Sequence, residues 1–211
     1  MARIPVEQRR EQLIEATATV LAEGGITALS TRSITAEADA PLAILHYAFG
    51  SLEELLEATM RAQVEVELQA GLAAVSGDGE PVDVIESALR AFLDFVRDNE
   101  GRERGLLELM LHAGRQPGLR KLAPQMYARY HSAMAEAAVS VAQHGGWQWR
   151  VPVEQVARFG TVQADGLVLA WLATHDEDLL SELIRASAQA LAGLAGEAPD
   201  RTTVESSGRA V

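Results

Sequence analysis

The chain has 211 residues, of which 48% are hydrophobic. This length fits one large or two small domains, and this hydrophobic share supports a buried core, so general disorder is excluded. The sequence contains no cysteine, which excludes disulfides, thiolate metal sites and a cysteine nucleophile. The net charge of −12 excludes a protein that coats nucleic acid or an anionic membrane through its overall charge.

The sequence also lacks a signal-peptide pattern and any apolar run long enough to span a membrane. We therefore expect a cytoplasmic protein with no membrane partner. Because the overall charge is acidic, any nucleic-acid binding must be local to one part of the chain.

Apolar residues recur at three- and four-residue spacing along the chain, a pattern that predicts helices and no strands. The first helix is expected to end at Gly24-Gly25, which resembles a C-terminal cap. Ser30 is an N-cap residue type and opens a short helix from Thr31 to Ala38. Asp39-Ala40 then breaks the pattern, and Pro41 is expected to open a third short helix that ends at Gly50.

The rest of the chain is predicted to be helical as well. Ser51 and Glu54 form a capping-box pattern at the start of a long helix. A loop is expected at residues 76–79, a bend at 145–149 and a disordered polar tail at 197–211. Further helices are expected over residues 81–99, 102–113, 119–143, 152–174 and 176–194.

Residues 30–49 have the dimensions of a helix-turn-helix: two helices of seven or eight residues joined by a short turn. Asp39 suits the turn, because aspartate tolerates a left-handed backbone better than most residues other than glycine. The second helix of such a motif can enter a DNA major groove. The spacing alone fits an ordinary helical hairpin about as well.

Residues 10–56 carry a more specific signal, an ordered set of positions without gaps. They are Leu13-Ile14, Ala16, Gly25, Thr31, Arg32, Ser33, Ile34, Ala38, Leu45, Phe49, Ser51 and Leu55. With these positions the segment resembles the N-terminal DNA-binding domain of the tetracycline-repressor-like (TetR/AcrR) family of bacterial transcription regulators.

The resemblance implies an all-α protein of about nine helices with two domains. Residues 6–51 would be the three-helix helix-turn-helix DNA-binding domain, and residues 52–196 the effector-binding and dimerisation domain. Such a protein would be a ligand-responsive regulator, most simply a repressor, that acts as a homodimer. Its partners would be a palindromic double-stranded operator and a small apolar or amphipathic effector. It would need no cofactor and would not be an enzyme.

The N-terminal segment departs from the family pattern in ways that bear on DNA binding. Leu52 stands where a phosphate-binding lysine is common, and Asp39 stands where glycine is usual in the turn. Residues 1–50 hold four arginines and six acidic residues, a net charge of −2. Few cations predict weak binding to random DNA and a shallow salt dependence. The alternative is a helical small-molecule-binding dimer with weakened or lost DNA binding.

The expected DNA contacts fall into two groups. Base readout is assigned to the start of the third helix through apolar contacts, although Leu42 could instead face the protein core. Phosphate contacts are assigned to cations, hydroxyls, one imidazole and a helix N-terminus. Together the expected DNA-binding residues are Arg9, Arg10, Thr31, Arg32, Ser33, Pro41, Leu42, Ala43, His46, Tyr47 and Ser51.

The C-terminal half contains aromatic, methionine and histidine residues that could line an apolar pocket with a few polar tips. A plain hydrophobic core explains them about as well. The candidates are Phe92, Phe95, Met110, His112, Met126, Tyr127, Tyr130, His131, Met134 and Trp147. No metal-ligand spacing and no pairing of a nucleophile with a base is visible in this half, which disfavours the second alternative, an all-α enzyme.

The last two predicted helices carry a broad apolar face with small residues, and one subunit has difficulty burying such a face alone. We expect a homodimer that forms through a four-helix arrangement. The interface residues are predicted to be Phe159, Val162, Gly166, Leu169, Ala170, Leu183 and Ile184.

Overall fold

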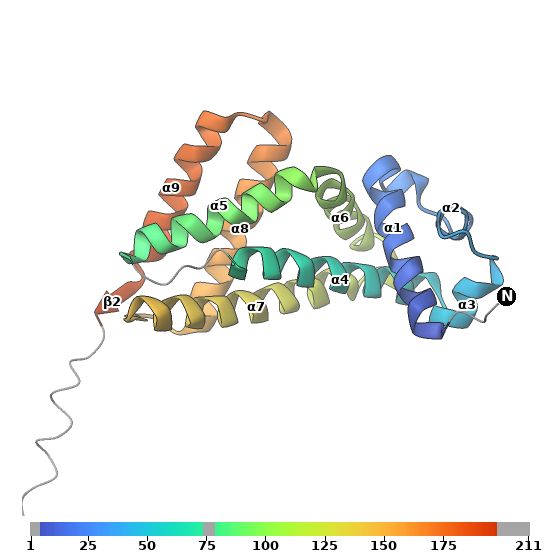
Figure 1. The fold of residues 1–211 in the computed structure, drawn as a ribbon, viewed down its shortest axis with the longest axis horizontal. Helices are drawn as coiled ribbons and strands as arrows, with labels where there is room; N and C mark the ends of the chain where they lie inside the picture. Colours follow the sequence, from blue (N-terminus) through green and yellow to red (C-terminus); the bar gives the residue numbers. More distant parts are fainter. Residues whose placement is uncertain (1–4, 74–78, 198–211) are drawn as a thin grey trace, which may run out of the picture.

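The computed structural model describes residues 5–73 and 79–197. Within these ranges it contains nine α-helices, so the expected all-α class is confirmed (Figure 1). Their bounds are α1 Val6–Ala28, α2 Thr31–Glu37, α3 Ala43–Phe49, α4 Leu52–Ala73, α5 Pro81–Asp98, α6 Glu100–Ala113, α7 Leu122–Gly145, α8 Val153–Thr174 and α9 Glu177–Ala192.

The expectation of no strands is wrong at two short segments. The strand β1 (Trp147–Trp149) pairs antiparallel with β2 (Ala195–Glu197), with Gln148 opposite Gly196. The three-residue strands are too short to show alternation in the sequence. They tie the α7–α8 connection to the end of α9, and the polar tail predicted from residue 197 onward falls outside the described residues except for its first residue.

Helices α1, α2 and α3 lie together at one end of the molecule, and we call them the head (Figure 1). Helix α4 leaves the head and runs along α7, while α8 packs on α7 and pairs with α9, which packs on α5. We call helices α4 to α9 the body. The head packs on the body mainly where α1 meets α6.

A glycine with a left-handed backbone conformation interrupts α1 near its C-terminal end. Gly25 has φ of 63°, a left-handed conformation in which glycine carries no steric penalty, so the regular helix stops there and resumes for about one turn to Ala28. The glycine pair expected to end the helix thus makes a kink, and α1 ends three residues after Gly25, at Ala28. The backbone N–H of Ile26, freed by the kink, donates to a Glu108 carboxylate oxygen of α6 at 2.9 Å.

The short helices of the head use side-chain caps. The Ser33 N–H donates to Ser30 Oγ at 3.0 Å, and the Ser30 N–H donates to Ser33 Oγ at 2.9 Å, which together form a capping box at the start of α2. At α4 only half of the expected box forms: the Glu54 N–H donates to Ser51 Oγ at 3.1 Å, while the Ser51 N–H donates to the Phe49 carbonyl.

The turn between α2 and α3 has the expected left-handed residue, since Asp39 has φ of 45°. The predicted start of the third helix at Pro41 is wrong by two residues, because α3 begins at Ala43. The Pro41 carbonyl accepts from the Ile44 N–H, three residues away, so Pro41 opens a turn and not an α-helical hydrogen-bond pattern.

Several later boundaries also move. Helix α6 begins two residues before the expected Arg102, because Asn99 already accepts from the Glu103 N–H. A 3₁₀ turn, η1 (Pro117–Leu119), occupies the expected start of the next helix, and α7 begins at Leu122. Helix α9 follows the N-cap Asp176, as expected, and ends at Ala192, before β2. Of the predicted loop at 76–79, only Gly79 lies within the described residues.

The buried residues form three clusters that divide head from body. The head cluster contains Leu13, Ala16, Ile34, Leu45, Ala48, Phe49 and Leu55. A middle cluster joins the end of α1 to α4, α6 and α7 through Leu21, Leu56, Met60, Val64, Leu106, Leu109, Ala113, Leu119, Leu122 and Met126. The largest cluster lies among α5, α7, α8 and α9 and includes Leu93, Val96, Val168 and Leu180. Helix α4 contributes to both of the first two clusters and therefore links head and body.

Candidate functional site

The outer face of α3 and of the turn before it carries exposed side chains. Leu42 is 53% exposed and Tyr47 is 61% exposed, while Pro41, Ala43 and His46 are also exposed. The inner face of α3 buries Leu45, Ala48 and Phe49 in the head cluster. A short helix that presents apolar and aromatic tips outward from a rigid support has the geometry of a recognition helix.

The sequence left open whether Leu42 faces the DNA or the protein core, and the structure shows that it faces away from the core. Its partly buried neighbour Ile44 does pack against the head cluster. Every residue assigned to base readout therefore lies on the outer surface of the head.

Three of the residues assigned to phosphate contact have partners within the head. Arg10 Nη1 donates to the Ala48 carbonyl, and its guanidinium carbon lies 3.9 Å from the centre of the Phe49 ring. Ser33 caps α2 and also donates to the Ala28 carbonyl at 2.7 Å, and Ser51 caps α4. These contacts hold α3 and the helix starts in place, a role that the sequence pattern indicated for Ser51 but not for Arg10 or Ser33.

Arg32 is exposed, whereas Arg9 and Thr31 are partly buried. His46 Nδ1 lies 3.3 Å from the Gly50 carbonyl, at the C-terminal end of α3. Leu52 is partly buried and packs against both the head and the middle clusters. A hydrophobic residue at this position therefore contributes to the contact between head and body.

The contact between α1 and α6 is close enough to couple the head to the body. A β-carbon built on Gly105 would lie 2.7 Å from the Leu21 carbonyl oxygen, so the two helix backbones touch there. Arg102 of α6 forms an ion pair with Glu15 of α1, and Glu108 accepts from Ile26, as described above. A shift of α6 would therefore move α1 as well.

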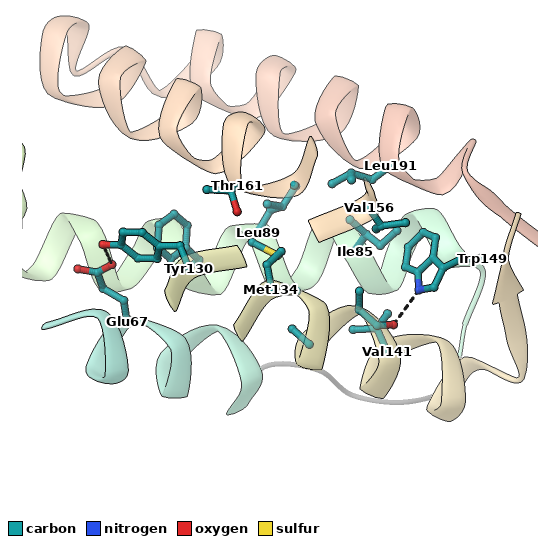
Figure 2. Close-up of a pocket in the computed structure, with 15 residues that line it drawn as sticks. Glu67, Ile85, Leu89, Tyr130, Met134, Val141, Trp149, Val156, Thr161 and Leu191 are labelled. Atoms are coloured by element: carbon teal, nitrogen blue, oxygen red, sulfur yellow. Dashed lines mark hydrogen bonds between the residues drawn. The ribbon is translucent and has the colours of Figure 1, made fainter. Parts of the chain in front are cut away.

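The body contains a cavity of about 140 Å³ among α4, α5, α7, α8 and α9 (Figure 2). Its lining is almost entirely apolar, with Glu67 and Tyr130 at one end and Trp149 at the other. The wall is formed by Glu67, Ile85, Ala88, Leu89, Phe92, Tyr130, Met134, Ala137, Ala138, Val141, Trp149, Val156, Gly160, Thr161 and Leu191.

Three of the ten residues proposed for a pocket from the sequence line this cavity: Phe92, Tyr130 and Met134. Met126 is buried in the middle cluster, against which Met110 and Tyr127 also pack, and Trp147 is buried in the largest cluster. His131 lies at a separate surface groove between α7 and α8. Phe95 and His112 are partly buried on α5 and α6, outside the lining.

Trp147 and Trp149 lie two residues apart in β1, and the structure gives them different roles. The two rings meet edge to face at 4.7 Å between centres. Trp149 Nε1 donates to the Ala138 carbonyl at 2.9 Å, which turns its ring toward the cavity (Figure 2). Since β1 sets this orientation, helical periodicity could not distinguish the two residues.

The polar end of the cavity contains carboxyl groups that sequence reasoning missed. Tyr130 Oη donates to Glu67 Oε2 at 2.9 Å, and the Glu67 carboxyl is hydrogen-bonded to that of Glu103. Tyr127 Oη donates to Asp165 Oδ2 at 2.7 Å. The three carboxyl residues come from three helices, α4, α6 and α8, and look like ordinary surface residues in the sequence, so no local pattern identifies them.

Burial controls the protonation of this cluster. Burial and the nearby Glu103 charge raise the pKa of Glu67 well above its usual range. Burial raises the pKa of Glu103 to about 7, and it raises that of Asp165 despite the bond from Tyr127. The pKa of Tyr127 rises to about 12 through burial and its bond to Asp165. Burial also raises the pKa of Tyr130.

Helices α8 and α9 carry aligned exposed residues on their outer faces. Val162 is 62% exposed and Leu169 is 56% exposed, and a β-carbon on Gly166 would meet no atom within 4 Å. Phe159, Ala170 and Leu183 are partly buried. Ile184 lies inside the largest cluster and is 2% exposed, so it packs within the subunit.

Among the described residues, no cluster of potential ligands is arranged to hold a metal ion. The helices described are also too short or too polar to cross a membrane.

Comparison with known proteins agrees with this geometry. Residues 13–59 match the model of the family described as bacterial regulatory proteins, tetR family. Over 188 residues the chain is 26% identical to the HTH-type nicotine-responsive transcriptional repressor HdnoR of Paenarthrobacter nicotinovorans, covering 87% of this chain and 96% of that protein.

Two solved structures share the fold along most of the chain. One is a protein from Rhodococcus sp. assigned to the TetR family of transcriptional regulators, with a TM-score of 0.72, 22% identity and coverage of 89% of this chain and 98% of that one. The other is the multidrug binding protein EbrR complexed with imidazole, with a TM-score of 0.60, 28% identity and coverage of 85% and 89%. Residues 13–59 thus match the tetR family of bacterial regulatory proteins, and they contain the helix-turn-helix of the head.

Proposed function

We propose that the chain is a repressor that binds a palindromic operator as a homodimer and releases it when a small effector enters the cavity of the body. In this proposal residues 6–51 bind DNA, and residues 52–196 bind the effector and dimerise. The observation that carries it is the outward face of α3, where Leu42, His46 and Tyr47 are exposed on a helix held by a buried inner face.

The mode of DNA binding follows from the chemistry of that face. Leu42 and Ala43 can contact thymine methyl groups in the major groove, and His46 and Tyr47 can contact phosphates. Arg32 and Arg9 would add phosphate contacts, whereas Arg10 would act by holding α3 in place. With so few cations, specificity would depend on the spacing of two recognition helices in the dimer.

The effector part of the proposal rests on the cavity and its neighbours. An apolar cavity with a single polar end has the usual composition of a small-molecule site. HdnoR is nicotine-responsive and EbrR is a multidrug binding protein, which supports a small-molecule response here. Glu103 of α6 is hydrogen-bonded to Glu67 of the cavity wall, and α6 also packs on α1. An effector that changes the position of α6 would therefore change the head.

The dimer part rests on the exposed stripe of α8. Val162, Gly166 and Leu169 recur at helical spacing and are open to solvent, as is Leu179 on α9. A second copy that brings its own stripe against these residues would form a four-helix interface.

The experiment that tests the function is selection of bound duplexes from a random DNA library by the full-length protein at low salt. We expect enrichment of one inverted repeat, because a two-fold symmetric dimer presents two equivalent recognition helices. If no duplex is enriched over the starting library, the alternative is correct: a small-molecule-binding dimer that has lost DNA binding, for which the acidic head and Leu52 are the structural reason.

A further inference from the structure

The hydrogen-bond donors on the cavity wall already have partners, whereas one acceptor group has free sites. Trp149 Nε1 donates to the Ala138 carbonyl and Thr161 Oγ1 donates to the Ala157 carbonyl, each at 2.9 Å. Tyr130 Oη donates to Glu67. These three donors are thus already used, whereas the Glu67 carboxyl, once its proton has left, accepts hydrogen bonds only and has further acceptor sites. A ligand that binds the ionised Glu67 must bring a donor or a positive charge.

The acidic charge at this end is buried and lacks a cation. Glu67 is 6% exposed and Glu103 is 8% exposed, and Asp165 is partly buried beside them. None of the ion pairs among the described residues includes any of the three. A buried carboxylate without a cation is costly when it is ionised, so an incoming cation would gain affinity here.

The groups that face this cluster come from every helix packed around it. They are Glu67 of α4, Glu103 of α6, Tyr127, Tyr130 and His131 of α7, and Asp165 of α8. His131 acts on Asp165 and not on Glu67. Glu67 is therefore the acidic group at the cavity wall itself, and it becomes the charged group when its proton leaves.

We propose that the cavity binds a small lipophilic cation, either a protonated amine or a quaternary ammonium on an apolar body, with the charge held against Glu67. The inference rests on the proposed effector role of the cavity and names the chemical class of the effector. Leu89, Met134 and Val156 would contact the apolar body (Figure 2). The ring of Tyr130 at the same end can also contact a cation through its face.

The size of the cavity limits the ligand. Its volume of about 140 Å³ is close to that of an engineered apolar cavity of about 150 Å³ that binds benzene. The cavity therefore suits one ring with short substituents.

Binding of such a cation is coupled to a proton. Glu67 and Glu103 share a hydrogen bond, and the raised pKa of both groups keeps a proton on the pair near neutral pH. A permanent cation replaces this proton, which leaves to solvent, so the net charge of the site is unchanged. An uncharged amine instead takes up the proton and becomes the cation. The affinity for a permanent cation consequently increases as the pH rises through neutrality.

The test compares two probes of the same shape by isothermal titration of the full-length protein without DNA. Phenyltrimethylammonium carries the charge, and tert-butylbenzene has carbon in place of the nitrogen. We expect the cation to bind at least about tenfold more tightly and to release up to about one proton per molecule near pH 7, measured in buffers of different ionisation enthalpy.

A matched pair of variants tests whether Glu67 causes the preference for the cation and the proton release. Glu67→Gln keeps an acceptor for Tyr130 but loses the charge, and we expect it to abolish both the preference for the cation and the proton release. Glu65→Gln makes the same change on the same helix at an exposed residue that pairs with Arg129, and we expect it to retain both. Binding of tert-butylbenzene to Glu67→Gln reports whether the cavity of that variant is intact.

Three results would overturn the inference: tert-butylbenzene binding to the wild type as tightly as the cation, no binding of the cation at millimolar concentration, or equal losses in the two variants. In the first case the cavity is a neutral apolar site, and the proposed regulator is unaffected. Since the titration contains no DNA, failure of operator binding does not change its outcome.

Discussion

At the residue scale, side chains of similar type have different roles in this protein because of what surrounds them. Arg10 and Arg32 are both basic residues of the head, yet Arg10 is bound to the end of α3 while Arg32 is exposed. Glu65 and Glu67 are two residues apart on α4, yet Glu65 pairs with Arg129 on the surface and Glu67 is buried at the cavity.

The first residue-scale prediction concerns Leu42. We expect Leu42→Ala to weaken binding to the selected operator about tenfold or more, since an apolar base contact is lost in both subunits, each contact being worth roughly 1 kcal/mol or more. Leu111→Ala is the matched control, because Leu111 is an equally apolar, 70% exposed residue on α6. Fluorescence anisotropy with labelled operator measures both, and equal affinities of the two variants would show that α3 does not read the bases.

The second residue-scale prediction concerns pH. The raised pKa of Glu103, about 7 against a usual 4.5, means that the folded state binds a proton more tightly than the unfolded state. This group therefore lowers the free energy of unfolding progressively as the pH rises from about 4.5 to about 7, by up to about 3 kcal/mol. Glu103→Gln should remove that loss, so its stability advantage over the wild type should grow across this window.

Urea unfolding at pH 5 and pH 8, at one protein concentration, checks this expectation. Glu57→Gln serves as the control, since Glu57 forms an exposed pair with Arg61 on α4. A difference between Glu103→Gln and wild type that stays constant from pH 5 to pH 8 would be incompatible with a raised Glu103 pKa.

At the scale of elements, the sequence predicts what local rules determine and misses what tertiary contact determines. The caps at Ser30 and Asp176 and the left-handed Asp39 follow from side-chain chemistry within a few residues, and all three are present. The start of α3 is displaced because a 3₁₀-type turn and an α-helical start have nearly the same sequence signal after proline.

The cavity shows the limit of sequence reasoning most clearly. Periodicity identifies which residues of α7 are apolar but not which of them face a cavity and which a core, so Tyr130 and Met134 line it while Met126 does not. The carboxyl cluster joins residues 67, 103 and 165, and only the packing of α4, α6 and α8 brings them together. A single sequence contains no signal for such a juxtaposition.

The element-scale prediction concerns the contact of α6 with α1. We expect Gly105→Ala to lower the free energy of unfolding by about 1–3 kcal/mol, because the added β-carbon meets the Leu21 carbonyl, a backbone atom that cannot rotate aside. Gly101→Ala is the graded control: its β-carbon would lie 3.0 Å from the Ala22 carbonyl. Its loss should be smaller, since this contact is less severe, while both substitutions gain the same helix propensity of about 1 kcal/mol.

Urea unfolding of both variants checks that Gly105→Ala loses more unfolding free energy than Gly101→Ala. Gly105→Ala as stable as the wild type would show that α1 and α6 can separate at no cost, and the proposed coupling of body to head through this contact would then be wrong.

At the scale of the whole molecule, the acidic net charge and the DNA-binding family are reconciled by where the charge lies. Residues 1–50 contribute −2 of the −12, so most of the acidity belongs to the body. Binding of DNA would therefore depend on two heads held at a set spacing by α8 and α9 and not on overall attraction.

The proposed dimer gives the prediction at this scale. Leu169→Glu should convert the dimer to monomers at micromolar concentration, because it places two charges in an apolar interface. Leu111→Glu makes the same change at an exposed leucine of α6, outside the proposed interface, and should leave the dimer intact. Sedimentation velocity measures both, and a wild type that is monomeric, or a Leu169→Glu variant that remains dimeric, would contradict the proposed α8–α9 interface.

The measurement that tests the central claim most directly is an anisotropy titration of the selected inverted repeat and of a shuffled duplex, repeated over a range of salt concentrations. We predict two chains bound per duplex and a preference of at least about a thousandfold for the inverted repeat. With so few exposed cations on each head, the logarithm of the affinity should fall with the logarithm of salt with a slope shallower than about −4. Equal affinity for the shuffled duplex would contradict the assignment of this protein as a sequence-specific dimeric repressor.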